Sequence, residues 1–75
     1  MPLSFVKPGK RVTLKEIIAG HGLRSHLAAM GMVPGVELEV VSGNSLGPFI
    51  VAIKNSRVML GRGMAAKIFV EQIND

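Results

Sequence analysis

The chain has 75 residues, with nine basic and five acidic side chains, and a formal net charge of +4. This length gives room for one domain, so we expect residues 1–75 to form a single small domain. The absence of cysteine excludes a disulfide scaffold, a thiolate zinc site, an iron–sulfur cluster and a cysteine nucleophile. The N-terminus lacks a signal-peptide pattern, and no apolar run approaches the ~20 residues of a membrane span. We therefore expect a soluble protein of the cytoplasm.

The N-terminal part of the chain predicts a helical turn at residues 3–6 and a first strand at residues 11–18. Val12 and Leu14 alternate with polar residues, as in a half-buried strand. The adjacent Ile17 and Ile18 then break this alternation. A break in phase is typical of a β-bulge, which bends a small sheet toward a barrel.

A short amphipathic helix is predicted at residues 23–30, after a loop at residues 19–22 that includes His21. Leu23, Leu27 and Met30 have the spacing of one helix face, and we expect all three to be buried against the sheet. Gly31 stands where a helix commonly ends in a left-handed residue, a conformation that costs glycine nothing.

The rest of the chain predicts four more strands. Pro34 and Gly35 form a turn in which we expect Gly35 to have a positive φ, and residues 42–48 form a second, turn-rich loop. The strands are expected at residues 36–41, 49–54, 58–60 and 68–73, with one helical turn at 61–66. The predicted fold is mainly β, a small curled barrel of about five strands with one α-helix.

Alternation along these strands separates an inner face from an outer one. The residues expected to fill the barrel are Val36, Leu38, Val40, Phe49, Val51, Ile53, Val58, Leu60, Ile68 and Val70. The apolar residues expected to point outward are Val41, Ile50, Ala52, Met59 and Phe69. An exposed apolar patch is the usual mark of a protein–protein contact. We therefore predict that Ile50, Met59 and Phe69 form a partner-binding surface, on strands that neighbour one another, with Arg57 and Arg62 at its rim.

No motif for catalysis, cofactor binding or tight metal binding is present. His21 and His26 are five residues apart and do not share a helix face. The acidic residues Glu16, Glu37, Glu39, Glu71 and Asp75 do not have the spacing of metal ligands. We predict no enzyme activity, no cofactor, no built metal site, and at most weak binding of Fe²⁺ or another divalent ion.

The chain resembles the FeoA family over nearly its whole length. The order helix, Gly31, Pro34, Gly35, strand is the more specific part of the resemblance, and shorter matching pieces surround it. The matching segments are residues 3–9, 20–22, 23–35, 46–48, 58–60 and 65–70.

This resemblance implies an SH3-like β-barrel that carries an extra helix. It also implies a cytoplasmic accessory or regulatory protein of bacterial ferrous iron uptake that acts by contact with the transporter FeoB. FeoB has a cytoplasmic GTP-binding region, so this contact would bring the protein to the inner membrane. Met59 and Phe69 would then be the anchors of the contact, and the helix surface around Arg24 and His26 is the next candidate.

Two alternatives stand beside this interpretation. The same fold occurs as the C-terminal domain of metal-dependent repressors, but we expect a free-standing domain because no DNA-binding segment precedes the barrel. The net charge also allows a basic SH3-like module that binds nucleic acid. The basic residues are spread along the chain without an arginine-rich run, which disfavours that second alternative.

Overall fold

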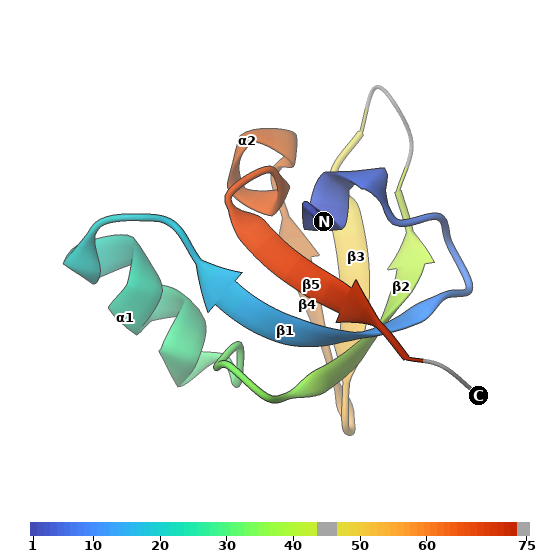
Figure 1. Cartoon of the computed structure of the whole chain (residues 1–75), viewed down its shortest axis with the longest axis horizontal. Coiled ribbons are helices and arrows are strands. Elements are labelled where there is room, and N and C mark those ends of the chain that lie inside the picture. The colour runs from blue at the N-terminus through green and yellow to red at the C-terminus, as the bar shows by residue number, and fades with distance from the viewer. Residues whose placement is uncertain (44–46, 74–75) are drawn as a thin grey trace.

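The computed structural model describes residues 1–43 and 47–73. These residues form a five-stranded antiparallel sheet with the strand order β4-β3-β2-β1-β5 (Figure 1). The strands are β1 (Arg11–Ile17), β2 (Glu37–Ser42), β3 (Phe49–Ile53), β4 (Ser56–Leu60) and β5 (Ile68–Gln72). The helices are the 3₁₀ turn η1 (Leu3–Phe5), α1 (His21–Ala29) and the short α2 (Arg62–Ala65).

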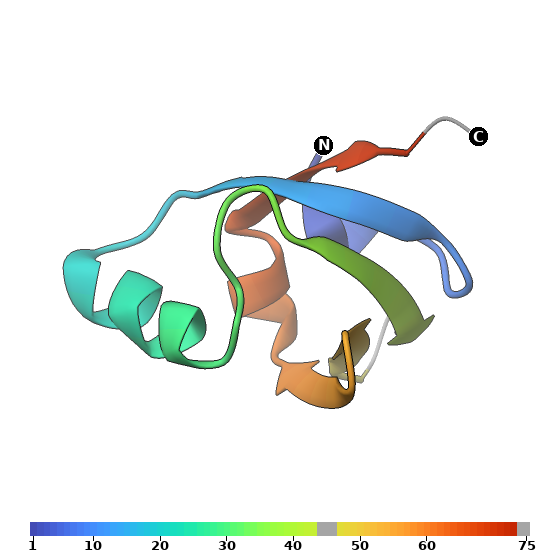
Figure 2. The same ribbon diagram turned by 90° about the horizontal axis from the view of Figure 1, so that it is seen from below.

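The sheet is strongly curled, as two views at right angles show (Figures 1 and 2). The buried apolar side chains form one core cluster. Nine of the ten residues predicted to fill the barrel are buried, and the tenth, Val36, is half-buried. The predicted class, a small mainly β fold with one longer α-helix, is therefore confirmed. The curled sheet is open, however, because β4 and β5 stand at opposite ends of the strand order.

A bulge bends β1, as the break in alternation predicted. The register between β1 and β5 shifts between Leu14, which pairs with Val70, and Glu16, which pairs with Phe69. The extra residue is Lys15, slightly before the predicted position at Ile17. A bulge redirects the strand that contains it, and after Lys15 the last residues of β1, Glu16 and Ile17, stay paired with β5 while the chain continues toward α1.

Helix α1 begins at His21, two residues before the predicted start. The expectation that His21 lies in a loop is therefore wrong. Gly20 has extended backbone angles and serves as the N-cap, and its carbonyl accepts the backbone N–H of Arg24 at 3.1 Å. Glycine is an acceptable N-cap, so the helix can begin directly after it even though Gly22 follows.

The C-terminal end of α1 is a Schellman motif around Gly31, which has φ +90° as predicted. The Gly31 N–H donates to the Ala28 carbonyl and the Met32 N–H donates to the Leu27 carbonyl, each at 3.0 Å. Leu27 and Met32 are both buried, which is the apolar contact that accompanies this motif. Leu23 and Met30 are only half-buried, so the predicted burial of the whole stripe is right for Leu27 alone.

Two turns connect the remaining elements. Gly35 has φ +95°, which confirms the predicted turn, and its N–H donates to the Leu14 carbonyl at 2.8 Å. The turn between β3 and β4 contains only Lys54 and Asn55, so β4 starts two residues earlier than predicted. The predicted loop at residues 42–48 lies partly outside the described residues, because positions 44–46 are not among them.

The burial of Leu27 gives a stability prediction. Leu27→Ala should lower the free energy of unfolding by ~2–5 kcal/mol, because it empties a fully buried site. Leu23→Ala is the matched control on the same helix, and it should cost clearly less because Leu23 is half-buried. Chemical denaturation followed by circular dichroism measures both. A loss for Leu27→Ala no larger than that for Leu23→Ala would contradict the packing described for α1.

Candidate functional site

Three residues of the predicted partner surface lie together on the hairpin formed by β3 and β4. Ile50 and Met59 are directly opposite each other, and Arg57 is opposite Ala52 on the same outer face. The exposed fraction of Met59 is 69%, which is large for an apolar side chain within a strand. Arg57 is exposed and Ile50 is half-buried. This hairpin therefore presents an apolar patch with a cation beside it.

Phe69 does not belong to the same patch. It lies on β5, which pairs with β1 at the other end of the strand order from β4. The expectation that its strand neighbours those of Ile50 and Met59 is wrong, because the sheet does not close between β4 and β5. Phe69 is half-buried and faces Pro2 across an isolated bridge.

Arg62 begins α2, and its guanidinium carbon lies 5.9 Å from the centroid of the Phe49 ring. This distance is within the range of a cation–π contact. Arg62 lines a hollow of about 260 Å³ together with Phe5 and Val6. Arg62, which was predicted as a rim cation, therefore also packs against the Phe49 ring.

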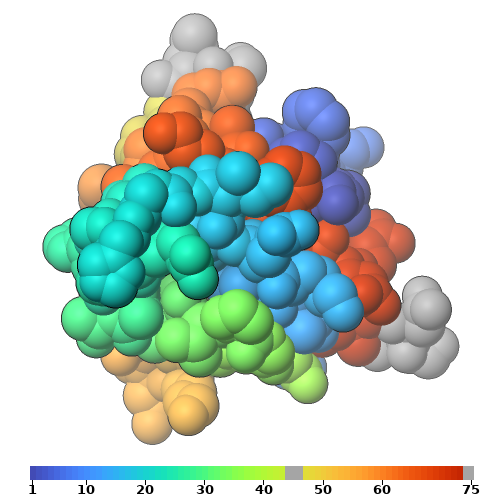
Figure 3. Space-filling model, turned by 60° about the vertical axis from the view of Figure 1, so that its left-hand side comes forward, coloured from blue at the N-terminus to red at the C-terminus, as the bar shows by residue number. Residues whose placement is uncertain are grey.

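A groove of about 360 Å³ lies between α1, the end of β1 and the segment that follows the helix. These three segments meet on one face of the molecule (Figure 3). Its lining residues are Glu16, Ile17, His21, Arg24, Ser25, Ala28, Met32, Val33 and Pro34. The sequence analysis did not find this groove, since the bulge in β1 and the turn at Gly31 create it by bringing distant residues together.

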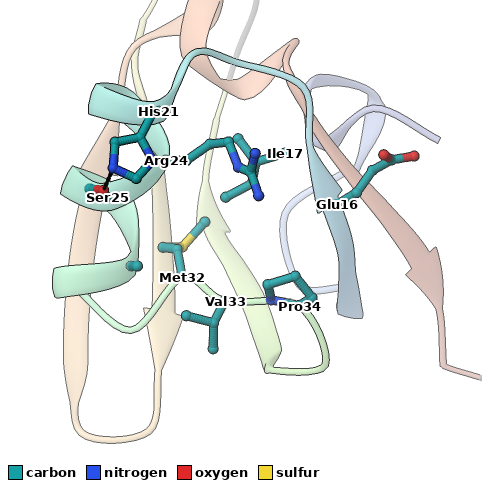
Figure 4. Close-up of a pocket in the computed structure, with 9 residues that line it drawn as sticks. Glu16, Ile17, His21, Arg24, Ser25, Met32, Val33 and Pro34 are labelled. Carbon is teal, nitrogen blue, oxygen red and sulfur yellow. Dashed lines mark hydrogen bonds between the residues drawn. The ribbon is translucent and has the colours of Figure 1, made fainter.

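The polar groups of this groove do not form a catalytic arrangement. His21 Nε2 and Ser25 Oγ are 3.4 Å apart and both residues are exposed (Figure 4). Arg24 points toward Ile17 across the groove, whereas the carboxylate of Glu16 points away from both (Figure 4). A serine nucleophile needs a base that a third group orients, together with donors for the oxyanion. Among the described residues, no such third group contacts His21. The sequence analysis missed the pair of His21 and Ser25 because it placed His21 in a loop. With the helix beginning at residue 21, their separation of four residues puts them on one helix face.

Two of the acidic residues that could have contributed to a metal site form salt bridges on the outer face of the sheet. Glu37 contacts Arg11 at 3.0 Å, and Glu71 contacts Lys15 at 3.2 Å. Within residues 1–43 and 47–73, no three histidine or acidic side chains gather closely enough to hold a metal ion. In the same ranges, no helix has the length and apolar character needed to cross a membrane.

Fold and surface together define a small SH3-like domain with a helix at its side. A family model described as the FeoA domain matches residues 1–72. The chain is 44% identical over 70 residues to a protein of Methanocaldococcus jannaschii named "Putative Fe(2+) transport protein A", covering 93% of this chain and 84% of the relative. The chain therefore belongs to the FeoA family.

Solved structures agree with this assignment. A crystal structure described as an iron uptake regulatory protein (FeoA) superposes with a TM-score of 0.91 at 32% identity, covering 97% of both chains. A manganese-dependent transcriptional repressor has a TM-score of 0.87 at 25% identity, and the match covers 97% of this chain but only 41% of the repressor. The fold is thus also found as part of longer, metal-dependent regulators.

The scattered positions of the histidine and acidic residues give a prediction for metal binding. Anaerobic calorimetry with Fe²⁺ should show no one-to-one site of micromolar or tighter affinity, because a tight site needs several ligands in one place. The variant His21→Ala/His26→Ala should titrate like the unchanged protein. A saturable micromolar site that this double variant abolishes would show that the histidines bind the metal.

Proposed function

We propose that the protein is an accessory or regulatory protein of ferrous iron uptake, and that it acts by contact with the cytoplasmic GTP-binding region of FeoB. The observation that carries this proposal is the FeoA match over residues 1–72. The relative in M. jannaschii is named for Fe(2+) transport, which supports the same process. In this role the protein works in the cytoplasm and reaches the inner membrane through FeoB.

The proposed contact surface is the hairpin patch, defined as Ile50, Arg57 and Met59 on the outer face of β3 and β4. Interfaces gain most of their binding energy from a few apolar anchors, and methionine adapts its shape to a partner. Met59 is exposed enough to serve as the anchor. Arg57 lies on the same strand face and would steer an acidic partner toward it. Arg62, on the neighbouring α2, remains a second predicted rim residue.

Phe69 remains a predicted anchor, but its position on β5 means that it must be tested separately from Met59. Its half-buried side chain offers less contact area than that of Met59. A contact that uses both residues would have to extend over much of the molecule. We therefore assign the larger share of the binding to the hairpin patch.

Binding to the FeoB GTP-binding region should be saturable and tolerant of salt, and it is best measured with GDP and with a GTP analogue. Met59→Ser should weaken it by about tenfold or more, as expected for loss of an anchor, and Phe69→Ser should have a smaller effect. Ile18→Ser is the matched control, because Ile18 is also apolar and exposed but follows β1. All three variants should keep the far-ultraviolet circular dichroism of the folded protein.

Two results would redirect this proposal. If folded Met59→Ser and Phe69→Ser both bind FeoB as tightly as the unchanged protein, the contact lies elsewhere, and the helix surface at Arg24 and His26 is tested next. If the protein instead binds RNA or DNA with an affinity that falls steeply with salt, the basic nucleic-acid module becomes the better description, because phosphate contacts release counterions.

A further inference from the structure

The two edges of the sheet differ in whether the chain itself covers them. At the β5 edge the N-terminal residues pair with the strand, since Pro2 forms a bridge with Phe69. The Val70 N–H donates to the Met1 carbonyl at 2.8 Å, and the N-terminal ammonium of Met1 donates to the Val70 carbonyl at 3.2 Å. The middle of this edge, at Phe69 and Val70, is therefore already occupied.

The β4 edge has no such cover among the described residues, because β4 pairs only with β3. The pairing covers five successive positions without a bulge, and Ile53 and Ser56 close the two-residue turn. In an antiparallel pair the hydrogen-bonded positions alternate, so the backbone groups of Arg57 and Met59 face the open side. An open and regular edge of this kind is a template for another strand.

A second groove of about 360 Å³ runs along this open edge. It is lined by four consecutive residues of β4, Ser56 to Met59, and by Ala29 and Met30 at the end of α1. Residues on one face of a strand alternate, so a groove that touches four in succession lies against the strand's edge. The half-buried Met30 and the Val58 side chain make its inner wall apolar.

The charge of the chain is concentrated in the part that includes this edge. Residues 40–70 contain Lys54, Arg57, Arg62 and Lys67 and no acidic residue. The rest of the chain then holds five basic and five acidic residues, from totals of nine and five, so the segment carries the whole net charge of +4. Like charges opposite each other destabilise strand pairing, so a second copy of β4 is a poor occupant.

We propose that the open edge of β4 binds an extended partner segment with alternating acidic and apolar side chains, which adds to the sheet as a further strand. The partner's backbone would bond to the free groups of Arg57 and Met59. Its acidic side chains would lie on the outer face beside Arg57, and its apolar ones would enter the groove next to Met30. Strand addition draws affinity from the main chain and specificity from such alternate side chains. This inference rests on the proposed partner surface around Met59 and states which kind of segment engages it.

A synthetic peptide of alternating glutamate and valine, seven residues long and capped at both ends, tests this inference, with lysine in place of glutamate as the matched control peptide. The glutamate peptide should bind and the lysine peptide should not. Arg57→Glu should lower the affinity for the glutamate peptide by about tenfold or more, and it should allow the lysine peptide to bind. Arg24→Glu is the control variant, because it changes the net charge equally on α1, where Arg24 lines the other groove.

Amide hydrogen exchange gives the structural readout. With the glutamate peptide bound, exchange at Arg57 and Met59 should slow, while exchange at the already paired Val70 should not change. Failure of the peptide to bind, or binding without slower exchange at Arg57 and Met59, would overturn the inference. A dimer in sedimentation that protects the same two amides would also overturn it in favour of a second copy.

The same experiments separate this inference from the proposed function. If the FeoB region binds and the peptide does not, the proposed function stands and the strand addition is wrong. If the peptide binds with protection at β4 and the FeoB region does not bind, the strand addition stands and FeoB is not the partner.

Discussion

Helix α1 is held to the sheet chiefly through its C-terminal end. Leu27 is its only buried residue, and the Schellman motif at Gly31 turns the chain so that Met32 packs into the same core. Both grooves of about 360 Å³ have α1 as one wall, the first along its length and the second at Ala29 and Met30. The left-handed backbone of Gly31 therefore contributes to the shape of both grooves, because it fixes how α1 leaves toward the core.

The outer face of the sheet is divided electrostatically. The strands β1, β2 and β5 carry charged side chains of both signs, and two pairs form salt bridges between strands, Arg11 with Glu37 and Lys15 with Glu71. Such exposed pairs contribute little stability. The three strands together carry two cations and four carboxylates, so they have no excess of positive charge. The hairpin of β3 and β4 has the cations Lys54 and Arg57 and no acidic residue, and its Met59 side chain is exposed. Because of this difference, electrostatic attraction would steer an acidic partner toward the β3–β4 side of the sheet.

The hairpin patch has features that suit recognition of a partner. It combines an apolar anchor, a cation and a strand edge that is unpaired among the described residues, whereas His21 and Ser25 of α1 are exposed and their side chains make a polar contact only with each other there. These features are coherent with the proposed accessory role in iron uptake, because a protein in that role can act by binding a larger one. The N-terminus pairs with the opposite edge of the sheet through an isolated bridge and two hydrogen bonds at Val70.

The sequence alone determined the local features of this protein. Alternation identified the strands and nearly all of their inward residues. The adjacent Ile17 and Ile18 signalled the bulge, and Gly31 and Gly35 marked the two left-handed turns. All of these signals depend only on residues that are neighbours in the sequence. Tertiary structure alone decided that β5 pairs with β1 and that β4 stays open. It also decided that Gly43 must be small, because a Cβ there would collide with the Phe49 ring. Contacts between residues far apart in the chain depend on how the whole sheet curls, and no local pattern encodes that curvature. For this reason Met59 could be predicted as outward-facing, whereas its separation from Phe69 and the groove beside it could not.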